Sequence, residues 1–161
     1  MSTVTSKPIQ RILFPTDFSP VANAAFGHAE RLAASTGARL IVLHVQQGLA
    51  TVGPINDVDR ETIRQLRAVR PRHRNLDVSR LVYAGSPGET ICWIAQEAQC
   101  DQIVMGTHGR TGLINLLMGS VAEHVVRHAR CPVLTVPTRA RNESPLPDPA
   151  IELRMPHAQP L

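Results

Sequence analysis

Lysine is nearly missing from this chain of 161 residues, although the chain is basic overall. Lys7, which precedes Pro8 near the N-terminus, is the one lysine among 17 lysine and arginine residues. A P-loop needs a lysine after its glycine-rich turn, and a Schiff-base enzyme needs a desolvated lysine. Both classes are therefore excluded, and any bound phosphate would have to be held by backbone amides, arginine or a metal ion.

Aromatic residues, paired cysteines and long apolar runs are scarce as well. Aromatic residues make up 3% of the chain, so no platform for stacking nucleic-acid bases is expected despite a formal net charge of +4. Cys92, Cys100 and Cys131 form no CxxC pair, which argues against a disulfide framework or a zinc knuckle. No apolar run reaches about 18 residues and no charged-then-apolar leader opens the chain, so we expect a cytoplasmic protein without membrane contact.

Apolar runs of strand length alternate along the chain with stretches of helical periodicity. Strands are expected at 12–14, 40–45, 78–84, 102–105 and 133–136, and helices at 20–36, 55–70, 87–98 and 120–129. Residues 48–54 are expected to form a loop. Five strands alternating with four helices indicate an α/β fold with an open parallel sheet covered on both faces.

Two terminal segments differ from this pattern. Residues 1–9 are expected to be a flexible leader, and residues 138–161 a flexible tail, because the tail holds five prolines and has no clear period. The predicted domain is therefore residues 10–137.

Serines mark the expected helix starts. Ser19 is placed to cap the first helix before a proline. Two capping boxes pair Ser86 with Glu89 and Ser120 with Glu123.

Arginines are concentrated on the second expected helix and just after it. Arg60, Arg64 and Arg67 fall on one helical face, and the basic stretch continues to Arg74. Two interpretations stay open, a solvated helix face or a surface for an acidic partner.

A glycine-rich loop connects the fourth strand to the last helix. Its glycines are Gly106, Gly109, Gly112 and Gly119. Glycine lets the backbone adopt positive φ and approach a ligand closely, and the amides and dipole of the following helix favour an anion. Ser120 could donate its hydroxyl to a phosphate oxygen or cap its own helix. The sequence thus indicates a phosphate site without lysine, and a purely structural loop is the alternative.

The glycine spacing resembles the nucleotide-binding pattern of the universal stress protein family, in its ATP-binding subgroup. That pattern is glycine, two residues, glycine, nine residues and glycine-serine, and here it is Gly106, Gly109, Gly119 and Ser120 with no departure in length. The segments 12–19 (ILFPTDFS) and 131–136 (CPVLTV) are also similar to that family. The resemblance covers residues 10–137.

The resemblance implies an open, doubly wound, Rossmann-like sheet of five parallel strands in the order 3-2-1-4-5. In such a sheet the ligand crevice lies where the winding direction reverses, between the first and fourth strands. Asp17, just past the first strand, and Gly106, just past the fourth, would then line the same crevice.

The resemblance also implies an ATP site. The residues that match the family's nucleotide contacts are Pro15, Thr16, Asp17, Val45, Met105, Gly106, His108, Gly109, Arg110, Gly119, Ser120 and Val121. Asp17 would accept hydrogen bonds from the ribose hydroxyls, although a helix-capping role is its alternative. His108 and Arg110 point to the phosphate region or are solvated loop residues, and His44 is expected to be a packed histidine. A Mg²⁺ ion bridging the phosphates is compatible with the site, but no cluster of protein ligands indicates one.

These observations favour a stress-response module that binds ATP and hydrolyses it slowly at most. Asp17, His108 and Arg110 are candidate parts, but no lysine or paired carboxylates join them to drive phosphoryl transfer. A regulatory dimer that binds cyclic AMP or no nucleotide is the first alternative. A nucleotidyl transferase is a minor one, because no HxGH motif lies near the first strand. The resemblance also implies a homodimer that pairs through Pro132–Val136, the alternative being a protected monomer edge.

Overall fold

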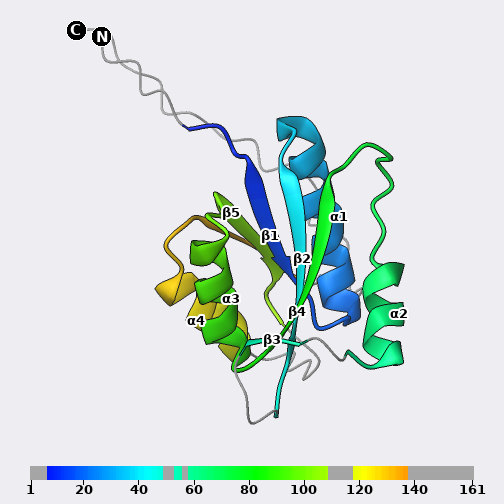
Figure 1. Cartoon of the computed structure of the whole chain (residues 1–161). Helices are drawn as coiled ribbons and strands as arrows, with labels where there is room; N and C mark the ends of the chain where they lie inside the picture. Colours follow the sequence, from blue (N-terminus) through cyan, green and yellow to red (C-terminus); the bar gives the residue numbers. More distant parts are fainter. Residues whose placement is uncertain (1–6, 49–52, 56–57, 109–117, 138–161) are drawn as a thin grey trace, which may run out of the picture.

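The protein forms one mixed sheet with helices on both faces (Figure 1). The structure, a computed structural model, describes residues 7–48, 53–55, 58–108 and 118–137. In chain order the elements are β1 (Arg11–Pro15), α1 (Pro20–Thr36), β2 (Arg39–Gln46), β3 (Gly53–Pro54), α2 (Arg60–Ala68), β4 (Val78–Ala84), α3 (Pro87–Glu97), β5 (Gln102–Gly106), α4 (Ser120–His128) and β6 (Val133–Val136). No helix in these ranges is long and apolar enough to cross a membrane.

The strand order is β3-β4-β2-β1-β5-β6. Its five long strands are parallel and follow the predicted order, so the predicted fold class is confirmed. One additional short strand, β3, pairs antiparallel with β4 in the segment 48–54, where the sequence predicts a loop. Gly53 and Pro54 carry no apolar pattern, so this short pairing depends on the neighbouring Tyr83 and Ala84 rather than on local propensity.

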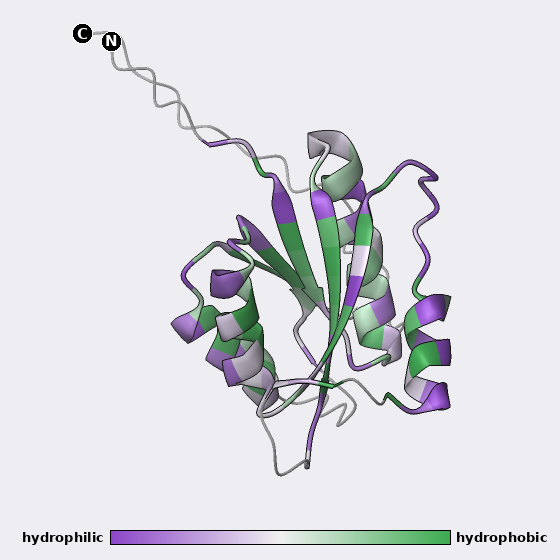
Figure 2. Cartoon of the chain, viewed as in Figure 1, coloured by the Kyte–Doolittle hydropathy of each residue, from purple (hydrophilic) through white to green (hydrophobic). Residues whose placement is uncertain are grey.

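Apolar strand residues alternate between two hydrophobic clusters, one on each face of the sheet. Ile12 and Phe14 of β1 face a cluster shared with α1 and α2, whereas Leu13 faces a cluster shared with α3 and α4. Figure 1 shows the two helix pairs on opposite sides of the sheet. In Figure 2 the central strands are hydrophobic over most of their length, as expected for strands covered on both faces.

The first helix begins and ends as its sequence predicts. The Ser19 hydroxyl accepts a hydrogen bond from the Ala22 amide at 3.2 Å, and Gly37 closes α1 in the left-handed conformation with φ of 70°. The second helix begins later than predicted, at Arg60 instead of residue 55. Asp59 caps it by accepting a hydrogen bond from the Thr62 amide at 2.9 Å.

The two predicted capping boxes do not form. Ser86 is the N-cap of α3, but its side chain makes no capping hydrogen bond among the described residues. The N-cap of α4 is Gly119, which places Ser120 inside the helix. Glu123 instead pairs with Arg127 one turn further on, at 2.8 Å, because an arginine at i+4 offers a charged partner.

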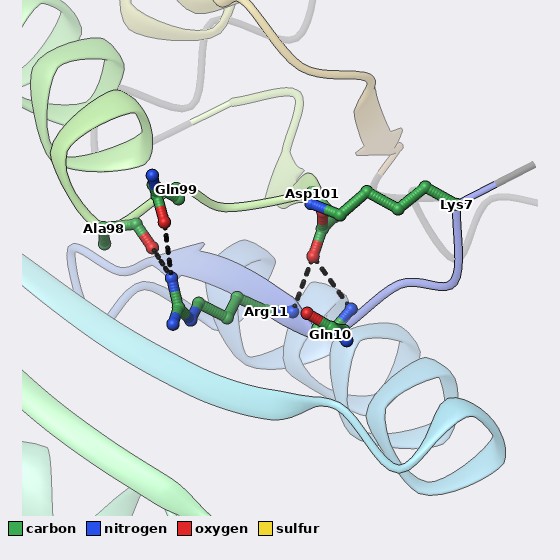
Figure 3. Close-up of polar contacts among 6 residues, drawn as sticks. All are labelled: Lys7, Gln10, Arg11, Ala98, Gln99 and Asp101. Carbon is green, nitrogen blue, oxygen red and sulfur yellow. Dashed lines mark hydrogen bonds and ion pairs between the residues drawn. The ribbon is translucent and has the colours of Figure 1, made fainter.

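Asp101 collects donors at the amino end of the sheet (Figure 3). It accepts hydrogen bonds from the Gln10 amide at 2.8 Å and the Arg11 amide at 3.0 Å, and from the Lys7 ammonium at 2.9 Å. The hydrogen bond from Lys7 lowers the pKa of Asp101, and the two amides lower it further against the opposing effect of burial. The only lysine of the chain is thus tied to the start of β5. Residues 1–6 of the expected leader and the tail at 138–161 lie outside the described residues.

Glu30 is the second carboxylate at this end and is 5% exposed. Its Oε1 atom accepts hydrogen bonds from the amides of Arg72 and His73 and from His73 Nδ1, the last two at 2.9 Å. Burial raises the pKa of Glu30, but these hydrogen bonds outweigh burial and lower the pKa overall. Glu30 therefore fastens the segment that leads into β4 onto α1.

The three cysteines pack against the cluster beneath α3 and α4. All three are free thiols. Burial raises the pKa of Cys100 to about 11 and also raises the pKa of Cys92 and of Cys131. Thiols in such surroundings stay protonated near neutral pH and are poor nucleophiles.

Candidate functional site

A cavity of about 700 Å³ lies at the carboxyl ends of β1, β2 and β5. The predicted site residues that line it are Pro15, Thr16, Asp17, Val45, Met105, Gly106, His108, Gly119, Ser120 and Val121. The other two predicted residues, Gly109 and Arg110, lie outside the described residues. Residues more than 100 positions apart in the chain therefore meet at the crevice that the strand order predicts.

The turn after β1 is held by its own side chains. The Thr16 amide donates to the Leu43 carbonyl at 2.8 Å, which extends the pairing of β1 with β2. The Thr16 hydroxyl accepts from the Phe18 amide, and Asp17 Oδ1 accepts from the Ser19 amide, both at 3.0 Å. Because Ser19 is the cap of α1, the capping alternative for Asp17 is wrong, and the aspartate instead braces the turn at the cavity wall.

Phe18 and His44 form an aromatic pair at this turn. Phe18 has φ of 64°, a conformation that bulky residues rarely adopt. Its ring stacks on His44 with centroids 4.4 Å apart. His44 Nδ1 lies 2.9 Å from the Thr16 carbonyl, which can only accept, so this nitrogen donates. His44 is packed, as expected, but it and Phe18 also line the cavity, which was not predicted.

Gly106 is needed because helix α1 lies very close to it, and not because its backbone has a positive φ. A Cβ atom at this position would lie 2.8 Å from Val21 Cγ1 of α1, and its φ is not in the left-handed region. Gly119 has φ of −74°, which any residue adopts. The positive φ that glycine allows in this loop is therefore not adopted at these two glycines, and Gly109 and Gly112 lie outside the described residues. Gly106 lets α1 pack directly onto the end of β5.

The start of α4 presents backbone amides to the cavity. The Gly119 amide is occupied, because it donates to the Thr107 carbonyl at 2.7 Å. The Glu123 amide donates to the Gly119 carbonyl at 2.9 Å, which begins the helical pattern. The amides of Ser120, Val121 and Ala122 belong to the first turn, where a helix has no internal acceptors for them. The helix therefore offers donors and the positive end of its dipole to an anion.

Charge at the cavity is sparse. Among its described lining residues, Asp17 is the one carboxylate and no lysine or arginine is present. The described part of the chain also holds no group of three histidine, cysteine or acidic side chains that could bind a metal ion. A Mg²⁺ ion at this site would depend on phosphate oxygens for most of its ligands. Among the described lining residues, the backbone at the start of α4 is therefore the source of positive potential for an anion.

Two helices contribute lining residues that the sequence did not indicate. Thr62 and Gln65 of α2, and Pro87 and Ile91 of α3, line the cavity from opposite sides. Helical periodicity places Thr62 and Gln65 on one face, but only the packing of α2 shows that this face meets the cavity. No motif in the sequence signals these contacts.

Comparison with known proteins agrees with this architecture. The universal stress protein family model matches residues 8–137. A universal stress protein of Methanocaldococcus jannaschii, MJ0531, is 33% identical over 138 residues, which cover 79% of this chain and 81% of that protein. A second protein of that organism, MJ0577, is 28% identical, with coverages of 79% and 94%.

Solved structures agree as well. A structure of hypothetical protein MJ0577 gives a TM-score of 0.71 at 29% identity and covers 83% of this chain and 99% of that chain. A universal stress protein in complex with cAMP has the same fold, with a TM-score of 0.65 at 24% identity and coverages of 81% and 98%. Since the family model spans most of the chain and the MJ0531 relative matches over four-fifths of its own length, the chain belongs to the universal stress protein family.

Proposed function

We propose that this protein is a stress-response module that binds ATP in the cavity at the carboxyl end of its sheet. The observation that carries the proposal is the convergence of the α4 first-turn amides and the turn after β1 on one cavity of about 700 Å³. Anion binding at a helix N-terminus requires no lysine. Fold relatives described in complex with cAMP and, from Archaeoglobus fulgidus, with dAMP hold adenine nucleotides in this fold.

In the proposed complex the triphosphate lies against the amides of residues 120–122. Asp17 accepts from the ribose hydroxyls, and the backbone of Val45 faces the adenine. Pro15 and Thr16 flank the adenine and ribose, and Met105 and Gly106 lie under the ribose. Gly109, His108 and Arg110 extend the phosphate site in the same proposal, and Mg²⁺ is held chiefly by the phosphates.

Hydrolysis is proposed to be slow. Phosphoryl transfer needs charge compensation and a positioned water, and the described lining residues include no cationic lysine or arginine. Arg110 is the candidate guanidinium of the loop. We expect turnover well below about 10 per second, the median for enzymes. A signalling role through binding therefore fits the site better than efficient ATPase activity.

Calorimetry of the full chain with ATP, ADP, cAMP and GTP tests the proposal. We expect ATP to bind in the micromolar range and to raise the melting temperature. Preferential binding of cAMP would favour the alternative regulatory module. Absence of heat and of thermal protection with every nucleotide, together with no nucleotide extracted from the denatured protein, would overturn the proposal.

A homodimer through β6 is part of the same proposal. The sheet order places β6 at one edge. Pro132 and Pro137 lie just outside Val133–Val136, so the strand's own residues keep their backbone N–H groups for pairing with a second strand. Leu134 is 38% exposed on this strand. Light scattering should give twice the chain mass, and a monomer at high concentration would contradict the dimer.

The proposed setting is the cytoplasm, where free thiols persist and ATP is abundant.

A further inference from the structure

Helix α2 buries fewer residues than α1 and α3 do. It buries Thr62 and Leu66, whereas α1 buries six residues along its length. Its C-terminal end is held by Arg80 of β4, which donates to the carbonyls of Leu66 at 3.0 Å and Val69 at 2.8 Å. An element anchored by so few buried side chains can shift at low energetic cost.

The two faces of α2 meet different surroundings. Thr62 and Gln65 line the cavity. On the opposite face, Arg60, Ile63 and Arg67 are exposed, and Ile63 is 37% exposed as a large apolar side chain. The exposed arginines continue beyond the helix. We call the exposed side chains of this segment the α2 arginine face: Arg60, Ile63, Arg64, Arg67, Arg70, Arg72 and Arg74.

The carboxylates near this face already have partners. Glu61 binds Arg64 at 2.6 and 2.8 Å and also accepts from Gln65. Asp59 caps the helix through Thr62. Asp77 pairs with Arg39 at 2.6 Å, and Glu30 is buried against the backbone of residues 72–73.

As a result, Arg64 is the one arginine of the α2 arginine face that has a carboxylate within ion-pair distance among the described residues, and the other five have none. The positive charge of these five arginines is left uncompensated within the part of the chain that the structure describes. A ligand that brings carboxylates would supply the missing partners.

We propose that the α2 arginine face docks an acidic peptide segment of a partner protein, and that nucleotide in the cavity changes its affinity through α2. Guanidinium groups form bidentate hydrogen bonds with carboxylates, and Ile63 provides an apolar anchor among the arginines. The face carries no aromatic side chain on which nucleic-acid bases could stack. The second half of the proposal rests on the proposed nucleotide function, because it requires a ligand against Thr62 and Gln65.

The first test uses the full chain and a fluorescent peptide of alternating acidic residues and leucines. We expect micromolar binding that weakens with salt and falls at least tenfold in Arg67→Glu. The matched control is Arg130→Glu, which makes the same charge change just beyond the C-terminal end of α4 and should keep the affinity. Both variants are checked by thermal melting. Equal loss in both variants, no binding, or equal binding of a single-stranded DNA of the same charge would overturn the docking surface.

The second test repeats the titration with saturating ATP. We expect the peptide affinity to change at least threefold and the ATP affinity to change by the same factor when peptide is present, since linkage is reciprocal. An unchanged peptide affinity with ATP bound would overturn the coupling. If ATP itself does not bind, the proposed function fails, while the comparison of Arg67→Glu with Arg130→Glu still decides the docking surface.

Discussion

The two ends of the sheet are built in opposite ways. At the amino end, Asp101 and Glu30 receive backbone amides from segments far away in the chain and close the structure. At the carboxyl end, the first-turn amides of α4 face an open cavity. The same kind of donor is thus satisfied by carboxylates of the chain at one end and is presented toward a ligand site at the other. Substitutions at the two ends should therefore separate stability from binding.

The largest expected effect is on binding, from Gly119→Val at the carboxyl end. A branched side chain beside the proposed phosphate position should weaken ATP binding roughly 100-fold, or about 2.8 kcal/mol. The backbone conformation of Gly119 suits any residue, so stability should fall by only about 1 kcal/mol through the poorer N-cap. Calorimetry and thermal melting measure the two effects. Wild-type affinity in a folded Gly119→Val variant would contradict the proposed site.

The next effect is on stability, from Glu30→Leu at the amino end. The amides of Arg72 and His73 would lose their buried acceptor, at a cost of about 2 kcal/mol in the free energy of unfolding. Glu30→Gln keeps an acceptor and should cost about 1 kcal/mol. Denaturant titration measures both. ATP affinity should not change, and a parallel loss of binding would show that the two ends are not independent.

A smaller effect is expected for Asp101→Asn, about 1–2 kcal/mol at neutral pH. The pKa of Asp101 is lower in the folded protein than its ordinary value of 3.8, so the charged carboxylate favours folding. This stabilisation is complete above pH 3.8 and is lost as the pH falls through the folded-state pKa. Stability curves of the wild type and Asp101→Asn should therefore converge in acid. Curves that stay parallel would contradict this role of the charge.

The smallest effect is expected for Lys7→Gln. The Lys7 side chain is 72% exposed, so its ion pair with Asp101 is solvent-screened and should contribute less than about 1 kcal/mol. Added salt should reduce the difference further. Chemical denaturation at low and high salt measures it, with Lys7→Arg as the charge-keeping control. A loss as large as that of Asp101→Asn would mean that the lysine, and not the backbone amides, dominates this end.

Much of the fold was predictable because the signals are local. The apolar runs of β1, β2 and β5 and the Ser19 to Gly37 frame of α1 depend on residues close together in sequence. The start of α2 was missed because Asp59 caps the helix later than the predicted start. The N-cap of α4 was missed because other partners bind the groups of the expected capping box. The Gly119 amide donates to the Thr107 carbonyl across the loop, and Glu123 pairs with Arg127. These contacts replace the predicted capping box of Ser120 and Glu123.

The candidate site also has one part that could be predicted from local sequence and one part that could not. The turn at 15–17 and the glycine pattern around Gly106 and Gly119 are contiguous segments, so their spacing can be read in the sequence. Phe18, Thr62 and Gln65 reach the cavity through a strained turn and a packed helix, and no spacing in the chain encodes such contacts.

The residue order alone was sufficient for the alternation of strands and helices, the absence of a P-loop lysine and the location of the helix start that we propose to bind an anion. These features follow from local propensity and composition, which act over a few residues. The meeting of Asp17 with Ser120, the α2 wall of the cavity and the tethering of Lys7 to Asp101 required the folded chain. They arise from packing between distant segments, where the shape of the neighbours sets which groups come within hydrogen-bond distance.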